Sequence, residues 1–358
     1  MLRGDVSRGG RMLAFVLVFL VGAGAALLVA GGNPGNMGIC GACFLRDLAG
    51  SLGLFVGRGP RIFRPELAGL MLGPLAFVLL RGRFEARSGS HAATRFFFGL
   101  LMGVGTLVFL GCPFRMLQRI GGGDLNAWLG ALGLVAGVGV GLAFEKRGYN
   151  LGRTSVVSRP VGLLGPLSLT ILFLLFLRGG VLFGPGPGAD APPAHAPWAL
   201  SFMVALGAGA VLSATRFCVI TAARQVYGGE RRMLAAALIL VVGYGLVAAS
   251  AGNFRLAFEG QPIAHSEGFW NVAALFLVGL CGCLVGGCPV RQIVMAGEGN
   301  GDAFVTVAGL VVGGGLSHSL KLASSGMGTT PGGRMVVAAG IAVAVAYAFW
   351  ISRSAGNR

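Results

Sequence analysis

The chain has 358 residues, of which 55% are apolar and only 11% are charged, and its mean hydropathy is +0.80. Because soluble domains carry about 25% charged residues, this composition excludes a soluble protein and predicts an all-α polytopic membrane protein. The net charge of +16 comes from short Lys and Arg clusters between apolar runs, without a basic face or tail. Such clusters favour membrane topology over nucleic-acid binding.

Ten apolar segments approach the length of about 20 residues that a spanning helix needs. They are residues 12–31, 66–81, 95–111, 125–144 and 161–178, then 197–214, 233–250, 269–287, 303–320 and 335–352. A Pro/Gly-rich linker, residues 179–197, separates membrane repeat 1 (1–178) from membrane repeat 2 (198–358). Because each repeat has an odd number of spans, the second is expected to be inverted relative to the first.

The distribution of Lys and Arg predicts the orientation. With the N-terminus inside, the inner segments hold 18 of these residues and the outer segments hold 10, so both termini are expected in the cytoplasm. The expected location is the bacterial inner membrane, with multiple passes. Segment 44–57 has 14 residues, which favours a short re-entrant half-helix over a full crossing.

Two short motifs occur once in each half of the chain, where the apolar runs break. Cys40-x5-Arg46 is matched by Cys218-x5-Arg224, 178 residues later. Gly-Cys-Pro-x-Arg ends at Arg115 and again at Arg291, and its cysteines, Cys112 and Cys288, are 176 residues apart. The nearly equal offsets indicate a duplication that kept four Cys/Arg pairs, and therefore one shared central site.

The chemistry of these motifs indicates a site for an anion. Pro113 and Pro289 disfavour helix in the preceding residue, so Cys112 and Cys288 are expected where one helix ends and a new short segment begins. Helix N-termini inside the bilayer offer N–H groups to anions, and arginine at membrane depth is a functional hypothesis by default. Thiols add soft, polarisable sulfur. The four matched cysteines are expected near the midplane, with the arginines toward the two mouths.

Ordinary structural roles compete with a functional role for each of these cysteines and arginines. A single Cys in a membrane helix is usually a small hydrophobe, and an Arg near a span end usually serves topology. Matched duplication favours function for the four cysteines named above, whereas Cys281 and Cys283 lack repeat partners and are interpreted as packing residues. Cys43 stays open, because its Cys-x2-Cys spacing with Cys40 is also a redox spacing. Asp124 and Asp302 each follow a glycine-rich stretch and open a span, and both are expected to be helix N-caps. No His, Asp or Glu cluster predicts a metal site, and no cofactor is expected.

Four blocks of the sequence resemble the YeeE/YedE family of sulfur-transport membrane proteins. They are NPGNMGICGACFLRDLAGSLGLF (33–55), FLGCPFRMLQRIGGGDLNA (109–127), TRFCVITAARQ (215–225) and GGCPVRQIVMAGEGNGDA (286–303). The first two look most like the YedE branch associated with selenium metabolism, which is described as a selenium transporter. The resemblance implies an hourglass of inverted repeats in which thiosulfate-type anions pass along cysteines by weak S–H···S contacts, a role that falls on Cys40, Cys112 and Cys288, with Cys218 as a fourth.

The sequence therefore predicts an inner-membrane permease, not an enzyme, for a small sulfur- or selenium-containing anion. Its predicted pore residues are Cys40, Cys112, Cys218, Cys288, Arg46, Arg115, Arg224 and Arg291, with Cys43 as a further candidate. A small cytoplasmic sulfur- or selenium-carrier protein is a candidate partner. The alternative is a transmembrane thiol–disulfide carrier of reducing equivalents, and a scaffold subunit without transport is a third interpretation.

Overall fold

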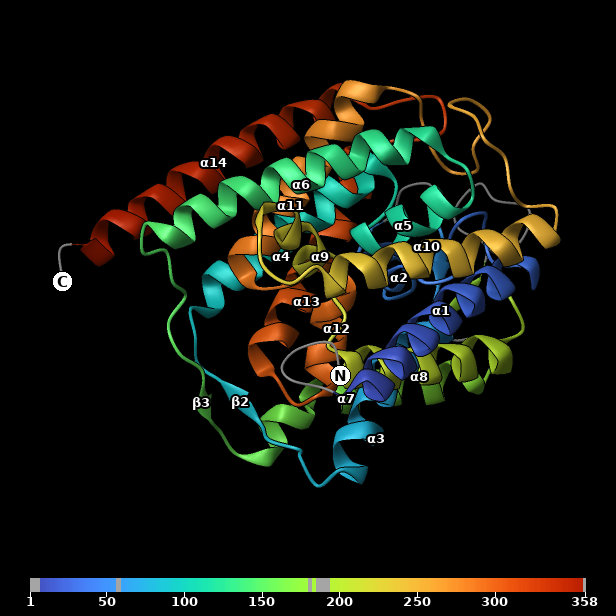
Figure 1. Ribbon diagram of the computed structural model, residues 1–358, viewed down its shortest axis with the longest axis horizontal. Helices are drawn as coiled ribbons and strands as arrows, with labels where there is room; N and C mark the ends of the chain where they lie inside the picture. Colours follow the sequence, from blue (N-terminus) through green and yellow to red (C-terminus); the bar gives the residue numbers. More distant parts are fainter. Residues whose placement is uncertain (1–6, 56–58, 180–181, 185–193, 357–358) are drawn as a thin grey trace.

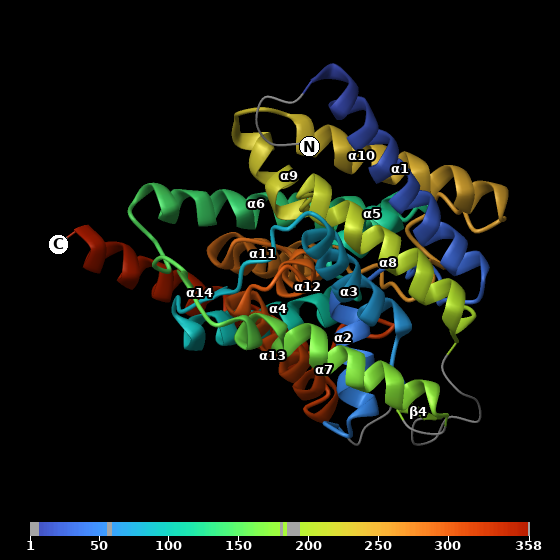
Figure 2. The same cartoon turned by 90° about the horizontal axis from the view of Figure 1, so that it is seen from below.

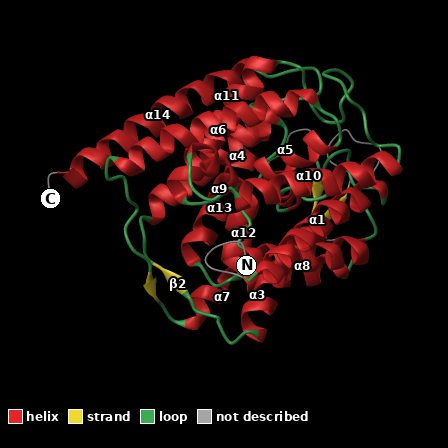
Figure 3. Cartoon of the chain, viewed as in Figure 1, coloured by secondary structure: helices red, strands yellow, loops and turns green. Residues whose placement is uncertain are grey.

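In the computed structural model, described over residues 7–55, 59–179, 182–184 and 194–356, the chain is almost entirely helical (Figures 1 and 3). The long helices are α1 Arg8–Ala30, α3 Pro65–Leu80, α4 Ala92–Phe109, α6 Leu125–Lys146, α7 Arg159–Leu177, α8 Trp198–Thr215, α10 Arg232–Ser250, α11 Gly268–Val285, α13 Gly301–Ser319 and α14 Pro331–Gly356. The short helices are α2 Gly41–Ser51, α5 Pro113–Gly121, α9 Val219–Arg224 and α12 Pro289–Gly297, and a single 3₁₀ turn, η1, covers Gln225–Tyr227.

Among the described residues, strands are limited to two antiparallel pairs of two residues each. In one pair β1 (Arg61–Ile62) lies beside β4 (Phe183–Gly184), and in the other β2 (Arg87–Ser88) lies beside β3 (Ser155–Val156). Most of the predicted linker, residues 180–181 and 185–193, lies outside the described residues. The predicted all-α class is confirmed, because these strands only tie loops together.

Each of the ten predicted segments coincides with one of the ten long helices. Among the described residues, eight helical stretches are long and apolar enough to cross a membrane. Helix α3, with 16 residues, and helix α13 are the two expected spans outside that set. The chain is thus a multi-pass membrane protein, and the count of ten spans stays a prediction.

The core of the molecule lies around α4 and α11. The most apolar windows of the stretches that begin with these helices are 83% and 78% buried, whereas the corresponding windows of α7 and α14 are only 28% buried. Figure 2 shows α14 at the periphery of the molecule. The outer helices expose large apolar side chains such as Leu20, Leu167 and Trp350, as expected for helices in contact with lipid.

Long helices of the two halves pack against each other in a reciprocal pattern. Helix α1 packs on α10 and α3 packs on α8, while α4 packs on α13 and α6 packs on α11. Glycines bring the backbones of these helices close together. In α6, a Cβ added at Gly133 would lie 2.0 Å from the backbone oxygen of Val272 in α11. One turn later, a Cβ at Gly137 would lie 2.1 Å from the oxygen of Phe276.

Gly137→Ala is expected to lower the free energy of unfolding by about 1–3 kcal/mol, because the added methyl group must push two helix backbones apart. Thermal unfolding of the purified protein in detergent measures this change. Gly207→Ala in α8 is the matched control, since a Cβ there has nothing within 4 Å. An equal effect of the two substitutions would contradict the close contact between α6 and α11.

Candidate functional site

Each of the four short helices begins at one of the repeat-matched cysteines. Cys40, Cys112, Cys218 and Cys288 are the N-cap residues of α2, α5, α9 and α12, which have 11, 9, 6 and 9 residues. None of these helices is long enough to cross a bilayer. In α2 the sulfur itself caps the helix, because Cys40 Sγ accepts a hydrogen bond of 3.3 Å from the backbone N–H of Cys43.

The chain reverses sharply just before three of these cysteines. Leu110, Arg216 and Gly286 have left-handed backbone conformations, with φ of 63°, 55° and 86°, and each lies two residues before its cysteine. Leu110 and Arg216 are not glycines, so these two turns carry local strain. Pro113 and Pro289 then open α5 and α12 at the first helical position, where a missing N–H costs nothing. The predicted break at the Cys-Pro pairs is confirmed.

The four sulfur atoms form two neighbouring pairs in the core. Cys40 Sγ lies 3.6 Å from Cys112 Sγ, and the thiols of Cys218 and Cys288 lie close enough to interact with each other. Cys112 is close enough to Cys288 for the two to interact electrostatically. The start of α2 also touches the start of α12, where a Cβ on Gly41 would lie 2.8 Å from Val290 N. All four cysteines are at most 3% exposed and none is in a disulfide.

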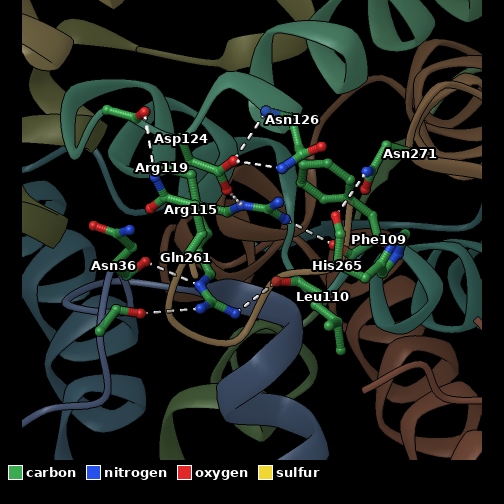
Figure 4. Close-up of polar contacts among 12 residues, drawn as sticks. Asn36, Phe109, Leu110, Arg115, Arg119, Asp124, Asn126, Gln261, His265 and Asn271 are labelled. Atoms are coloured by element: carbon green, nitrogen blue, oxygen red, sulfur yellow. Dashed lines mark hydrogen bonds and ion pairs between the residues drawn. The ribbon is translucent and has the colours of Figure 1, made fainter. Parts of the chain in front are cut away.

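Cys43 and Arg115 lie beside the first of these pairs. The guanidinium of Arg115 donates to the backbone oxygens of Gly35 (3.0 Å), Asn36 (2.9 Å) and Leu110 (2.6 Å) (Figure 4). Its Nη1 lies 3.8 Å from Cys43 Sγ. Arg115 therefore ties the chain before Cys40 to the turn before Cys112. Gln118 of α5 adds to this tie by accepting from the N–H groups of Gly38 and Ile39.

A second buried arginine supports α5 from the opposite end. Arg119 Nε lies 2.7 Å from Asp124 Oδ2, and its Nη1 donates to Phe109 O at 2.7 Å (Figure 4). Asp124 also caps α6 by accepting from Asn126 N at 2.9 Å, so its predicted capping role is confirmed. Nearby in the loop before α11, burial lowers the pKa of His265, whose neutral ring donates from Nε2 to Val108 O at 2.9 Å. This network holds the α4–α5–α6 corner rigid.

Arg46 and Arg224, the other two predicted pore arginines, are paired with carboxylates. Arg46 Nε lies 2.6 Å from Asp47, which also binds Arg64 at 2.8 Å. Arg224 makes a two-pronged pair with Glu145 and donates to Cys283 O. With the predicted pore cysteines they interact only electrostatically, Arg46 with Cys40 and Cys43 and Arg224 with Cys218. The structure therefore groups the four cysteines more tightly than it groups the arginines.

Arg291 lies in a cavity that reaches the second cysteine pair. This inner cavity, of about 180 Å³, is lined by Arg216, Cys218, Thr221, Gly286, Arg291, Met295 and Glu298. A wider cleft of about 580 Å³ shares Arg216 and Glu298 with it, and is also lined by Arg81, Arg83 and Arg87. We call the cleft and the inner cavity together the vestibule. Among the described residues, Arg81, Arg83 and Arg216 make no ion pair with a carboxylate.

Sequence reasoning missed three residues that shape this site: Glu298, Arg216 and Gln118. Glu298 Oε1 and Oε2 accept from the two terminal nitrogens of Arg291 at 3.0 and 3.1 Å. Arg291 and Glu298 are seven residues apart, which is two helical turns, and this spacing was the signal in the sequence for an ion pair. Arg216, two residues before Cys218, carried a signal in its position within the TRFC block. No signal in the sequence marked Gln118, because its hydrogen-bond partners come from a loop that is distant in the sequence.

The remaining predicted features have plain structural roles. Cys281 and Cys283 lie within α11 in the packed core, and Cys283 touches Glu145 at 3.8 Å. Among the described residues, no three His, Cys, Asp or Glu side chains gather where they would hold a metal ion. The predicted N-cap role of Asp302 is wrong. Asn300 caps α13, and Asp302 instead accepts hydrogen bonds from Ser88, Gly89 and Ser90 before α4.

Fold and site together define a multi-pass helical membrane protein with two buried thiol pairs at the starts of four short helices. No protein-family model matches the chain, and no curated protein matches it in sequence. The geometry of the thiols and the vestibule is therefore the basis for the function proposed below.

Proposed function

We propose that the protein is an inner-membrane permease for a small sulfur- or selenium-containing anion and that it is a YeeE/YedE-type transporter without enzymatic activity. The observation that carries the proposal is the position of the four matched cysteines. Each one starts a short helix, and together they form two adjacent thiol pairs, with 3.6 Å between Cys40 Sγ and Cys112 Sγ. Packing alone does not require a cysteine at the start of all four short helices.

The reciprocal packing of helices supports two inverted repeats as the frame of this permease. In two such repeats, α1, α3, α4 and α6 of the first half correspond to α8, α10, α11 and α13 of the second half. The contact between α1 and α10 then has its counterpart in the contact between α8 and α3. The contact of α4 with α13 likewise has its counterpart in α11 with α6. A two-fold relation between the halves produces such exchanged pairs. In this frame α2, α5, α9 and α12 are re-entrant half-helices that meet at the centre.

The vestibule supports a direction for access. Its charged lining residues come from segments 81–95, 215–232 and 288–302, which the Lys and Arg distribution predicts to be cytoplasmic together with both termini. The vestibule is therefore the cytoplasmic mouth, where a small sulfur- or selenium-carrier protein has access to Cys218. In this scheme, the tie that Arg115 makes between the segment before Cys40 and the turn before Cys112 closes the path on the outer side.

Passage of an anion follows from weak, repeated contacts. The N-termini of the short helices supply partial positive charge, and Arg291 supplies a full one. The thiols offer soft donors that hold a sulfur or selenium atom briefly, and conduction requires sites that release as readily as they bind. No covalent step is needed in this scheme.

Uptake of labelled thiosulfate and selenite by cells tests the proposal. Cys112→Ser and Cys218→Ser are each expected to reduce uptake of the transported anion by at least about tenfold, since the hydroxyl keeps the size but lacks the polarisable sulfur. Cys281→Ser is the matched control, because Cys281 is equally buried and has no repeat partner. Uptake that survives serine at all four matched positions would rule out passage along the sulfurs.

One observation favours the second candidate, a thiol–disulfide carrier. Cys40 and Cys112 are close enough that a modest movement would let a disulfide form, and Cys43 N–H contacts Cys40 Sγ. Such a carrier moves reducing equivalents without anion uptake. A change in thiol redox state on the far side of a membrane, without accumulation of anion, would favour it.

A further inference from the structure

The two repeat-matched arginines at the Cys-Pro motifs are held in different ways. Arg115 is fixed by three backbone oxygens, which cannot leave without unfolding the turn. Arg291 is held by one side chain, the carboxylate of Glu298, and the side chains of the pair are 12% and 22% exposed. The residue 176 positions before Glu298 is Gly122, so the first half has no such carboxylate. Only the second arginine has a partner that rotation of a side chain can release.

Both charges of this pair oppose the dipole of α12. Arg291 is the third residue of the helix, where the dipole favours anions, and Glu298 is the C-cap, where the dipole favours cations. The pair therefore does not serve to stabilise the helix termini. A cation near a helix N-terminus is, in contrast, what an anion site needs, because the guanidinium and the helix dipole then act on the same ligand.

The surroundings of the pair are built for an anion. Arg291 lies in the inner cavity with Cys218, two residues after Arg216. The wider cleft of the vestibule adds Arg81 and Arg83, which, like Arg216, have no carboxylate partner among the described residues. An anion entering this cleft is attracted toward Arg291, and there it meets Glu298. Ser213 Oγ donates to Glu298 Oε1 at 2.8 Å and holds the carboxylate in this place.

We propose that Glu298 is a built-in competitor that occupies the oxyanion site of Arg291 and yields it to the transported anion. The two carboxylate oxygens, 3.0 and 3.1 Å from the guanidinium nitrogens, stand where two oxygens of a thiosulfate-like or selenite-like anion bind. When the anion takes Arg291, the carboxylate turns toward Arg216 and the cleft. Glu298 thereby keeps the site weak and excludes anions that cannot displace it. This inference rests on the proposed transport function.

The test compares Glu298→Gln with wild type in binding of thiosulfate and selenite to the purified full chain in detergent, by titration calorimetry. Glutamine keeps the size and the contact with Ser213 but removes the competing charge. The dissociation constant of the transported anion is expected to fall about tenfold, and that of sulfate is expected to fall as well. Ser213→Ala, which only loosens the carboxylate, is expected to give a smaller fall of about two- to threefold.

Glu267→Gln is the control, because Glu267 pairs with Arg334 through both oxygens at 3.0 and 3.1 Å but does not line the vestibule. Its dissociation constant should equal that of wild type. If uptake depends on the matched cysteines but Glu298→Gln binds the anion with unchanged or weaker affinity, the inference about Glu298 is overturned and the transport proposal stands. Absence of thiosulfate and selenite binding in both wild type and Glu298→Gln would overturn the transport proposal with it.

Discussion

Asp124→Asn is expected to lower the free energy of unfolding by about 3–5 kcal/mol, because it leaves the charge of Arg119 buried without its partner. Both side chains are 0% exposed, and the guanidinium is packed 4.1 Å from the ring centroid of Phe109. Asparagine is as good an N-cap as aspartate, so the loss reports the ion pair and not the start of α6. Thermal or denaturant unfolding in detergent measures it.

Glu230→Gln is the control for this prediction. Glu230 pairs with Arg232 at 3.0 Å, but its side chain is 60% exposed, and such surface pairs contribute at most about 1 kcal/mol. Equal losses in the two variants would mean that the Arg119–Asp124 pair does not hold the corner between α4 and α6.

Arg115→Lys is expected to reduce anion uptake by at least about tenfold while the positive charge is kept. A lysine has no planar fork, so it cannot satisfy the oxygens of Gly35, Asn36 and Leu110 at once. The segment before Cys40 then loses its tie to the turn before Cys112, and the two sulfur atoms are no longer held 3.6 Å apart. Arg115 acts in this account as a positioning residue.

Uptake rates and unfolding midpoints measured on the same preparations separate this effect from a general loss of folded protein. Arg255→Lys serves as the control, because Arg255 is an exposed loop arginine that also donates to a backbone oxygen, that of Gly260. Wild-type uptake by Arg115→Lys, per folded molecule, would show that the fork is not required.

Much of the helical framework was predictable because it depends on local signals. Apolar runs of the right length gave the ten long helices, and a proline after Cys112 and Cys288 gave the starts of α5 and α12. Segment 44–57 was expected to be too short to cross, and α2 ends at Ser51 after 11 residues. Repetition supplied the rest, since equal offsets between the motifs marked four cysteines out of seven.

The partners of the arginines were not predictable, because they come from residues distant in the sequence. Backbone oxygens of residues 35 and 36 hold Arg115, about 80 residues away, and no residue type at those positions announces it. The sequence placed the arginines toward the two mouths of the pore. It could not show that backbone oxygens fix Arg115 whereas the side chain of Glu298 holds Arg291. The predicted N-cap role of Asp302 was wrong for a similar reason, because the loop before α4 offers its carboxylate hydrogen-bond donors.

In the proposed transport, the anion passes along both cysteine pairs without net electron transfer. Purified protein in liposomes, without any other protein, provides the most direct measurement. Accumulation of labelled thiosulfate or selenite is followed together with the redox state of a thiol probe trapped inside. The account predicts saturable accumulation that is lost when Cys40, Cys112, Cys218 and Cys288 are all serine, with no change in the probe. Accumulation that persists in the four-serine variant, or reduction of the probe without accumulation of anion, would contradict it.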